Sequence, residues 1–118
     1  MTMNPISAFT GATVDRIVGD DLVSAYCLAM MKEAAAIGDA IDCPIAESGE
    51  ERIGVARRLG VFKTSMLQDV EAGKPLEIDV LLTAVREIAA YVGMATPNLD
   101  ALLGLTRLFA RTRGLYPA

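Results

Sequence analysis

Apolar side chains recur every three or four residues along nearly the whole of this 118-residue chain. The clearest stripe consists of Ile78, Leu81, Leu82, Val85, Ile88, Ala89 and Val92. This spacing places apolar side chains on one face of an α-helix, and no stretch shows the apolar–polar alternation of a half-buried strand. The length leaves room for one core. We therefore expect residues 1–118 to form a single all-α domain, a bundle of five or six helices.

The pattern also indicates which segments are helical. The segment 22–41 is apolar nearly all round, which is typical of a helix in the middle of a bundle. The stripe from Val55 to Val70 has no breaker except two glycines, so one long helix is expected there. The expected helices cover, in chain order, 5–18 in one or two pieces broken at Gly11, then 22–41, about 48–72, 78–92, and the residues after Thr96.

Several helix ends carry local signals. Asn4-Pro5 and Thr96-Pro97 each offer an N-cap residue followed by proline at the first helical position. Ser48 with Glu51 three residues later matches a capping box. Gly73, two residues before a proline, predicts a helix end, because glycine takes the left-handed cap and proline cannot continue the helix.

The charge and the absence of histidine narrow the range of functions. A net charge of −4 gives no electrostatic reason to bind nucleic acid or an anionic membrane surface. The chain contains no histidine, the commonest metal ligand and general base. No metal-ligand spacing, phosphate loop or base paired with a nucleophile is visible. We therefore expect no metal site and no nucleic-acid partner.

The cysteines and the N-terminal residues indicate in which cellular compartment the protein is expected. Cys27 lies in an apolar stretch and Cys43 precedes a proline. Two isolated cysteines without a visible signal peptide are typical of reduced, cytosolic thiols. The charge-free run 22–31 is too short to cross a bilayer. We expect a cytoplasmic protein without a membrane segment.

Three residues could carry chemistry, although each also has a structural explanation. Ser65 lies at the border of a buried stripe, where its hydroxyl could donate to a ligand or to the helix carbonyl four residues earlier. Glu77 would be favourable in the first turn of a helix on dipole grounds alone. Asn4 would serve as an N-cap. Taken alone, none of the three identifies a function.

Four segments, taken together and in order, are more specific. They are Met3–Thr13 with an Asn-Pro pair, Ser65–Asp69 with the pattern Ser-x-Leu-Gln-Asp, Pro75–Asp79 with Glu-Ile-Asp, and Val92–Asn98 with Gly-x-x-Thr-Pro. Their order and spacing resemble the C-terminal helical domain of the ketopantoate reductase (2-dehydropantoate 2-reductase) family. The resemblance spans essentially the whole chain. It implies a helical fold like the C-terminal domain of 6-phosphogluconate dehydrogenase-type enzymes.

The resemblance also implies roles for the three residues. In this family an N-terminal Rossmann domain holds NADPH, hydride passes to the ketone of a 2-keto acid, and a lysine protonates the developing alkoxide. By position, Asn4 and Ser65 match substrate-binding residues. Glu77 matches a catalytic glutamate beside the substrate and the lysine, where an acidic neighbour helps to keep that lysine protonated.

The chain departs from the family pattern in two respects. The family's lysine precedes the Asn-Pro segment, where this sequence has only residues 1–3, and none of Lys32, Lys63 and Lys74 occupies its place. No Gly-x-Gly-x-x-Gly follows a predicted strand. We therefore expect no cofactor and no activity for this chain alone, and a 2-keto acid substrate only in a full enzyme. The alternatives are a stand-alone dimerisation or interaction module, and a half-enzyme completed by a separate nucleotide-binding chain.

The departures from the family pattern also affect the oligomeric state that we expect. Without a Rossmann half, apolar surface on the helices 22–41 and 78–92 should be exposed. Burying such surface gains roughly 25 cal/mol per Å². We therefore expect a homodimer with a predominantly apolar, helix-on-helix interface, in which the short N-terminal helices could be exchanged between protomers.

Overall fold

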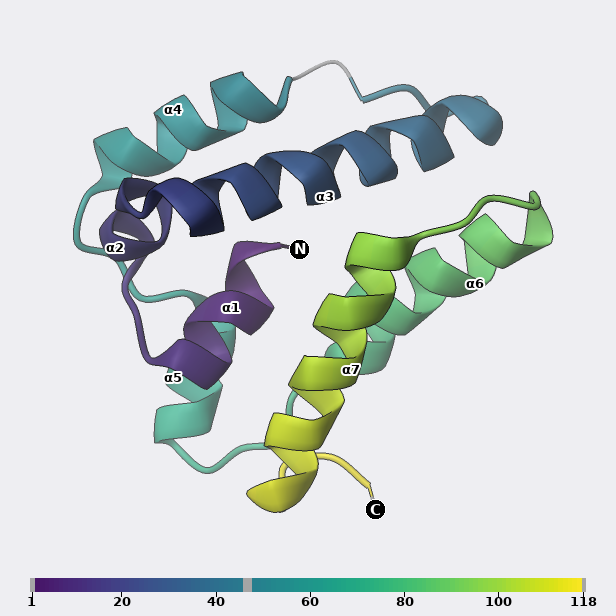
Figure 1. Cartoon of the computed structure of the whole chain (residues 1–118). Helices are drawn as coiled ribbons and strands as arrows, with labels where there is room; N and C mark the ends of the chain where they lie inside the picture. The colour runs from purple at the N-terminus through teal and green to yellow at the C-terminus, as the bar shows by residue number, and fades with distance from the viewer. Residues whose placement is uncertain (1, 46–47, 118) are drawn as a thin grey trace.

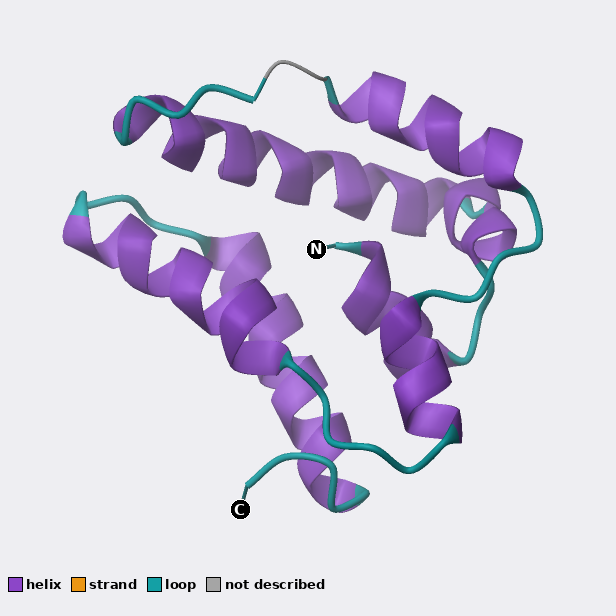
Figure 2. Cartoon of the chain, turned by 180° about the vertical axis from the view of Figure 1, so that it is seen from behind, coloured by secondary structure: helices purple, strands orange, loops and turns teal. Residues whose placement is uncertain are grey.

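The computed structural model describes residues 2–45 and 48–117. These residues form helices joined by turns and loops. They form seven α-helices and one π-helical segment, with no strand among them (Figures 1 and 2). The elements are α1 Met3–Thr10, α2 Val14–Gly19, α3 Asp21–Ala40, α4 Gly49–Leu59, α5 Ser65–Glu71, η1 Asp79–Thr83, α6 Ala84–Tyr91 and α7 Pro97–Thr112. The prediction of an all-α domain is confirmed.

The helices form a flat, roughly triangular arrangement (Figure 1), with extents of 37 × 36 × 21 Å. One side is α3 with α4 packed antiparallel to it, and α2 lies at their end. A second side is α1 packed against α5, and the third is formed by α6 and α7. The N-terminus lies in the middle of the triangle, while α7 contacts both α1 and α3.

The core lies where α3, η1 and α7 meet. Its largest fully buried apolar side chains are Met30, Ile78, Leu82, Leu99 and Leu102. Most of these belong to the apolar stripes that the sequence shows, so burial of one helix face explains them. Thr106 is also fully buried, and its hydroxyl donates to the carbonyl of Leu102 at 2.6 Å.

The long helix expected from Ser48 to Ala72 is wrong, and its division explains why seven α-helices form. Gly60 adopts φ 67° and ends α4, while the Thr64 hydroxyl caps α5 by accepting from the amide of Leu67 at 3.2 Å. The intervening carbonyls of Gly60 and Phe62 accept from the first amides of α2, at 3.1 and 2.9 Å. No side chain caps α2. The break therefore satisfies amide groups that α2 would otherwise leave unpaired.

Other predicted helix ends are mostly confirmed. The Asp20 carboxylate caps α3, and the Ser48 hydroxyl accepts from the amide of Glu51. Gly11, Gly73 and Gly93 take positive φ after α1, α5 and α6. Asn4 is not an N-cap, because α1 begins one residue before it. The helix expected over 78–92 forms, but its first part is the π-helical segment η1.

Candidate functional site

Asn4 and Ser65, which are 61 residues apart in sequence, are in direct contact where α1 meets α5. The Asn4 Oδ1 accepts a hydrogen bond from the Ser65 hydroxyl at 3.2 Å and another from the backbone amide of Met66 at 3.4 Å. Ser65 is the first residue of α5. The expectation that its hydroxyl bonds back to a carbonyl of its own helix is therefore wrong.

Buried hydroxyls fix this contact from behind. Ser7 is fully buried on α1, and its hydroxyl donates to the carbonyl of Asn4 at 2.9 Å. The same hydroxyl also hydrogen-bonds with that of Thr64, the residue that caps α5. Each hydroxyl has one hydrogen, so Thr64 donates to Ser7 while Ser7 donates to Asn4. This chain of hydrogen bonds ties the start of α5 to the first turn of α1.

The contact fixes which way the Asn4 amide faces. The amide of Met66 can only donate, so the oxygen of the Asn4 side chain faces α5. The NH₂ group then points away from α5, and it donates to no acceptor within residues 2–45 and 48–117. Asn4 therefore offers two free donors, which suits the recognition of a carboxylate, carbonyl or hydroxyl oxygen.

Asn4 lines a cleft of about 930 Å³. The cleft lies between helices α3, α4 and α6 and the first turn of α1. Most of its lining residues are apolar, among them Met31, Ala35, Val55, Leu59 and Ile88. Thr64, Lys32, Glu50 and Arg52 also line it. An apolar hollow with a few polar groups is the usual form of a small-molecule site. Lys32 brings positive charge to the cleft that Asn4 lines.

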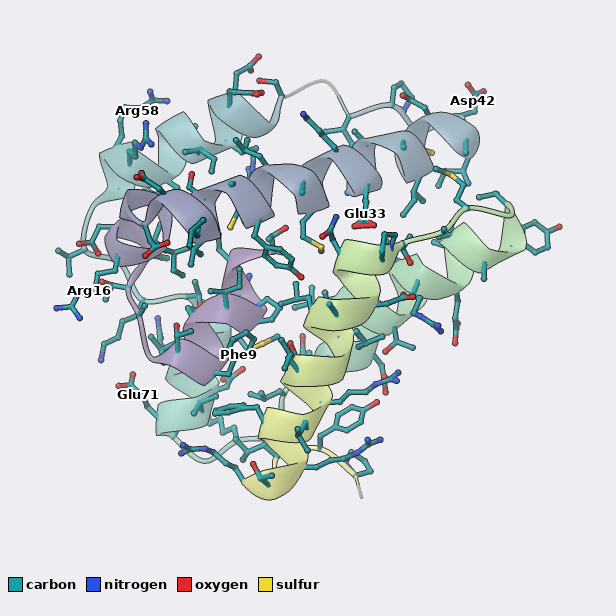
Figure 3. All side chains as sticks on the ribbon, viewed as in Figure 1. Phe9, Arg16, Glu33, Asp42, Arg58 and Glu71 are labelled. Atoms are coloured by element: carbon teal, nitrogen blue, oxygen red, sulfur yellow. The ribbon has the colours of Figure 1, made fainter. Side chains whose placement is uncertain are left out.

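Lys32 is a residue of the cleft that sequence reasoning did not select. It interrupts the otherwise apolar helix α3, and so does its neighbour Glu33. Glu33 has a structural role, because its carboxylate accepts from the amides of Asn98 and Leu99, each at 3.1 Å, and so caps α7 (Figure 3). A charged residue in an apolar helix was therefore a usable signal, but the signal alone does not separate Lys32 from Glu33.

Glu77 makes no hydrogen bond with either of the other two residues. It is exposed on the connector between α5 and η1, directly before the first helical residue, Ile78. Its carboxylate makes no hydrogen bond or ion pair with any described residue, and neither Glu77 nor Ser65 lines the cleft. The structure thus joins Asn4 to Ser65 but shows no contact between this pair and Glu77.

Other chemistry finds little support in the described part of the chain. Residues 2–45 and 48–117 contain no cluster of three or more His, Cys, Asp or Glu side chains that could hold a metal. Burial raises the pKa of the Cys27 thiol to about 11, so Cys27 is a poor nucleophile. Lys63 pairs with Glu71 at 3.0 Å. Within those ranges, every helix is too short or too polar to cross a membrane.

Known proteins match nearly the whole length of this chain. The family model of the ketopantoate reductase PanE/ApbA C terminal matches residues 1–110. A 2-dehydropantoate 2-reductase of Mesorhizobium japonicum is 45% identical over 116 residues, which cover 98% of this chain and 36% of the relative.

Solved structures agree. A protein of Ralstonia solanacearum assigned as a ketopantoate reductase is 63% identical, with a TM-score of 0.91, over 98% of this chain and 35% of that one. The 2-dehydropantoate 2-reductase of Methylococcus capsulatus is 28% identical, with a TM-score of 0.86, over 93% of this chain and 38% of that one. This chain therefore spans little more than a third of the length of these relatives.

Proposed function

This chain belongs to the ketopantoate reductase C-terminal family, and we propose that it supplies the substrate-holding half of an NADPH-dependent reductase of 2-keto acids. The observation that carries the proposal is the Asn4 amide. Its oxygen is fixed by Ser65 and Met66, and its two N–H donors remain free beside the cleft. A 2-keto acid presents carboxylate and carbonyl oxygens, which are acceptors that such donors would orient.

Charge in the cleft is consistent with this substrate class. Lys32 lines the cleft with Asn4, so an anionic ligand would gain from it, and Glu50, which also lines the cleft, would oppose that ligand. The Ser65 hydroxyl donates to Asn4. It can therefore accept from a substrate hydroxyl, or rotate to donate to a carboxylate while Met66 still holds the Asn4 oxygen.

We propose that Glu77 acts beside a lysine that is supplied by residues other than those described. A carboxylate near a lysine favours its charged form and so keeps the proton available for the alkoxide. The described residues do not fit a dinucleotide, because they include no strand and hence no strand–glycine turn–helix on which NADPH could lie. We therefore expect no NADPH oxidation by this chain alone. We also propose that the complete reaction takes place in the cytoplasm.

A hybrid protein tests the proposal. The matching segment of the Ralstonia solanacearum relative would be replaced by this chain, which is 63% identical to it. Consumption of NADPH with ketopantoate would be followed for the hybrid and for its Ser65→Ala variant. Hydrogen bonds to charged groups contribute about 1.5–3 kcal/mol, so Ser65→Ala should raise KM by at least about tenfold.

Controls separate the proposed roles. Ser24→Ala, on α3, should leave KM unchanged. Glu77→Gln should lower kcat by about tenfold or more. Glu87→Gln, at an exposed position on α6, should leave kcat unchanged. A folded hybrid that binds NADPH but reduces no 2-keto acid would contradict the proposal. So would a hybrid whose kinetics ignore both Ser65 and Glu77.

We also propose that the chain forms a homodimer, because it exposes large apolar side chains. On 78–92 they are Val80, Ile88 and Tyr91, and on α7, which the sequence did not single out, they are Leu105 and Leu108. Sedimentation at micromolar concentration should show a species of twice 12.5 kDa. A 12.5 kDa species alone would count against the dimer. A dimer combined with an inactive hybrid would favour the stand-alone interaction module, and activity restored by a separate nucleotide-binding chain would favour the half-enzyme.

A further inference from the structure

The residues after α7 form a tight turn that lies outside the segment matched by the family model. Gly114 takes φ 69° and reverses the chain, and its amide donates to the carbonyl of Arg111 at 3.1 Å. The amide of Leu115 donates to the carbonyl of Ala110 at 2.8 Å. This is the hydrogen-bond pattern of a glycine-terminated helix end. The family model's match stops at residue 110, whereas the 116-residue match to the Mesorhizobium japonicum relative extends into this tail.

Two consecutive tail residues bond to residues on either side of Glu77, one in the connector and one at the start of η1. The carbonyl of Leu115 accepts from the amide of Leu76 at 3.0 Å. The hydroxyl of Tyr116 donates to Oδ1 of Asp79 at 2.6 Å. Glu77 follows Leu76 and lies two residues before Asp79, so it stands between a residue bonded through its backbone amide and a residue bonded through its carboxylate. In Figure 1 the tail leaves the lower end of α7 and runs to the right of it toward the C-terminus.

Further contacts keep the tail and Asp79 in place. The Arg111 guanidinium lies 5.3 Å from the centre of the Tyr116 ring, and its Nε donates to the carbonyl of Pro117 at 3.0 Å. Thr83 donates to the same oxygen of Asp79 at 2.8 Å and accepts from Arg107 at 3.0 Å. The hydrogen bonds from Tyr116 and Thr83 lower the pKa of the Asp79 carboxyl.

Closing the core does not require all of these contacts. Leu76 and Leu115 are buried, so their packing and mutual hydrogen bond have a structural explanation. Asp79 is exposed, and a hydrogen bond at the surface adds little to stability. The effect left for the Tyr116–Asp79 bond is geometric, because it fixes the start of η1 just after Glu77. A π-helical turn is itself common at functional sites.

We infer that the tail 114–117 is a clamp that positions Glu77, with Tyr116 as the positioning residue. The inference rests on the proposed function in assigning Glu77 a role in 2-keto acid reduction. Tyr116 touches no reacting group in this scheme; it acts through Asp79 on the backbone of Glu77. The contacts themselves do not depend on the reaction, so they can be tested separately from it.

The first measurement uses the full 118-residue chain. Backbone ¹⁵N relaxation would give order parameters for residues 76–79 in the wild type, in Tyr116→Phe and in the control Tyr91→Phe. The Tyr116→Phe variant keeps an aromatic ring near Arg111, so the fold should persist. The order parameter at Glu77 should fall from the rigid range near 0.85 toward the flexible range below about 0.6. Tyr91 is 92% exposed, and its variant should change nothing. Unchanged order at Glu77 in Tyr116→Phe would overturn the clamp.

The second measurement uses the hybrid enzyme. Tyr116→Phe should lower kcat by several-fold and leave KM unchanged, because Glu77 is placed beside the proton donor and not at the substrate's carboxylate. If Glu77 loosens and kcat does not change, the positioning role is overturned. If Glu77 loosens and the unaltered hybrid reduces no 2-keto acid, the clamp stands as a contact and the proposed function fails.

Discussion

The contact between α1 and α5 and the connector before η1 hold their proposed site residues in opposite ways. Asn4 and Ser65 are hydrogen-bonded to each other, and the buried hydroxyls of Ser7 and Thr64 lie behind them. The Glu77 carboxylate bonds to no described residue, and only its neighbours in the chain are held. Asn4 and Ser65 are placed by contacts of their own side chains, whereas Glu77 is placed only through its neighbours in the chain.

This difference determines what a substitution should change. At the α1–α5 contact, the same residues serve the fold and the proposed substrate, so loss of a partner leaves a polar group unsatisfied and lowers stability. On the connector, the Glu77 carboxylate contributes nothing to folding, so its loss should appear only in chemistry. Each of the following experiments could break this distinction.

The largest effect is expected for Thr64→Ala. It removes the cap of α5 and a hydrogen-bond partner of the buried Ser7 hydroxyl, and caps contribute about 0.5–2 kcal/mol. The free energy of unfolding in urea should fall by about 2 kcal/mol. Thr112→Ala, at the exposed end of α7, is the matched control and should change it by less than about 0.5 kcal/mol. Equal losses in the two variants would mean that the α1–α5 contact is not specially stabilising.

Asn4→Ala should have a smaller effect on stability. The variant loses the oxygen that accepts from Ser65 and Met66, and a hydrogen bond contributes about 1 kcal/mol. Urea unfolding should show a loss of that size. Asn98→Ala serves as the control, because the Asn98 side chain makes no hydrogen bond with other described residues. A stable Asn4→Ala protein would show that α5 does not depend on this contact.

Glu77→Ala should leave the free energy of unfolding within about 0.5 kcal/mol of the wild type. A contrasting variant is Glu33→Ala, which removes the carboxylate that accepts from two amides of α7 and should cost about 1–2 kcal/mol. The two variants remove the same kind of side chain from a structural and a proposed catalytic position. A clear loss of stability in Glu77→Ala would contradict the description of the connector.

The smallest effect concerns the titration of Asp79. Its pKa is lowered in the folded chain, so its stabilisation is present above the ordinary carboxyl pKa and is lost as pH falls through the lowered value. Tyr116→Phe should raise the Asp79 pKa toward its usual range, as followed by carboxyl ¹³C shifts. Asp100, whose pKa is lowered chiefly by Arg86, is an internal control and should not move. An unmoved Asp79 would mean that Tyr116 does not hold it in solution.

The helices that follow from local pattern were predictable, and those that depend on distant contacts were not. The apolar run of α3 and the glycines at 11 and 73 placed helix ends correctly. The break at 60–64 was missed because its carbonyls serve α2, which lies more than 40 residues earlier in the chain. A glycine within an apolar stripe is also compatible with a continuous helix, so the sequence could not show that Gly60 adopts positive φ.

In the candidate site, too, features that depend on distant contacts were not predictable from the sequence. Local rules made Asn4 an N-cap of its own helix, whereas its side chain bonds to the start of another helix. The family resemblance selected Asn4, Ser65 and Glu77, but only the structure shows that two of them touch. Lys32 was not selected because its place in the cleft depends on how α3, α4 and α6 pack. Tyr116 was not selected either, since its partner is 37 residues away.

The most direct test of the central claim, that Asn4 serves both the fold and the substrate, is Asn4→Asp in the hybrid enzyme. An aspartate keeps an oxygen for Met66 and Ser65, but it replaces the free NH₂ donors with an acceptor that repels a carboxylate. The urea midpoint should be retained, and KM for ketopantoate should rise at least about tenfold, or about 1.4 kcal/mol. An unchanged KM with a retained midpoint would contradict the claim, because Asn4 would then serve the fold alone.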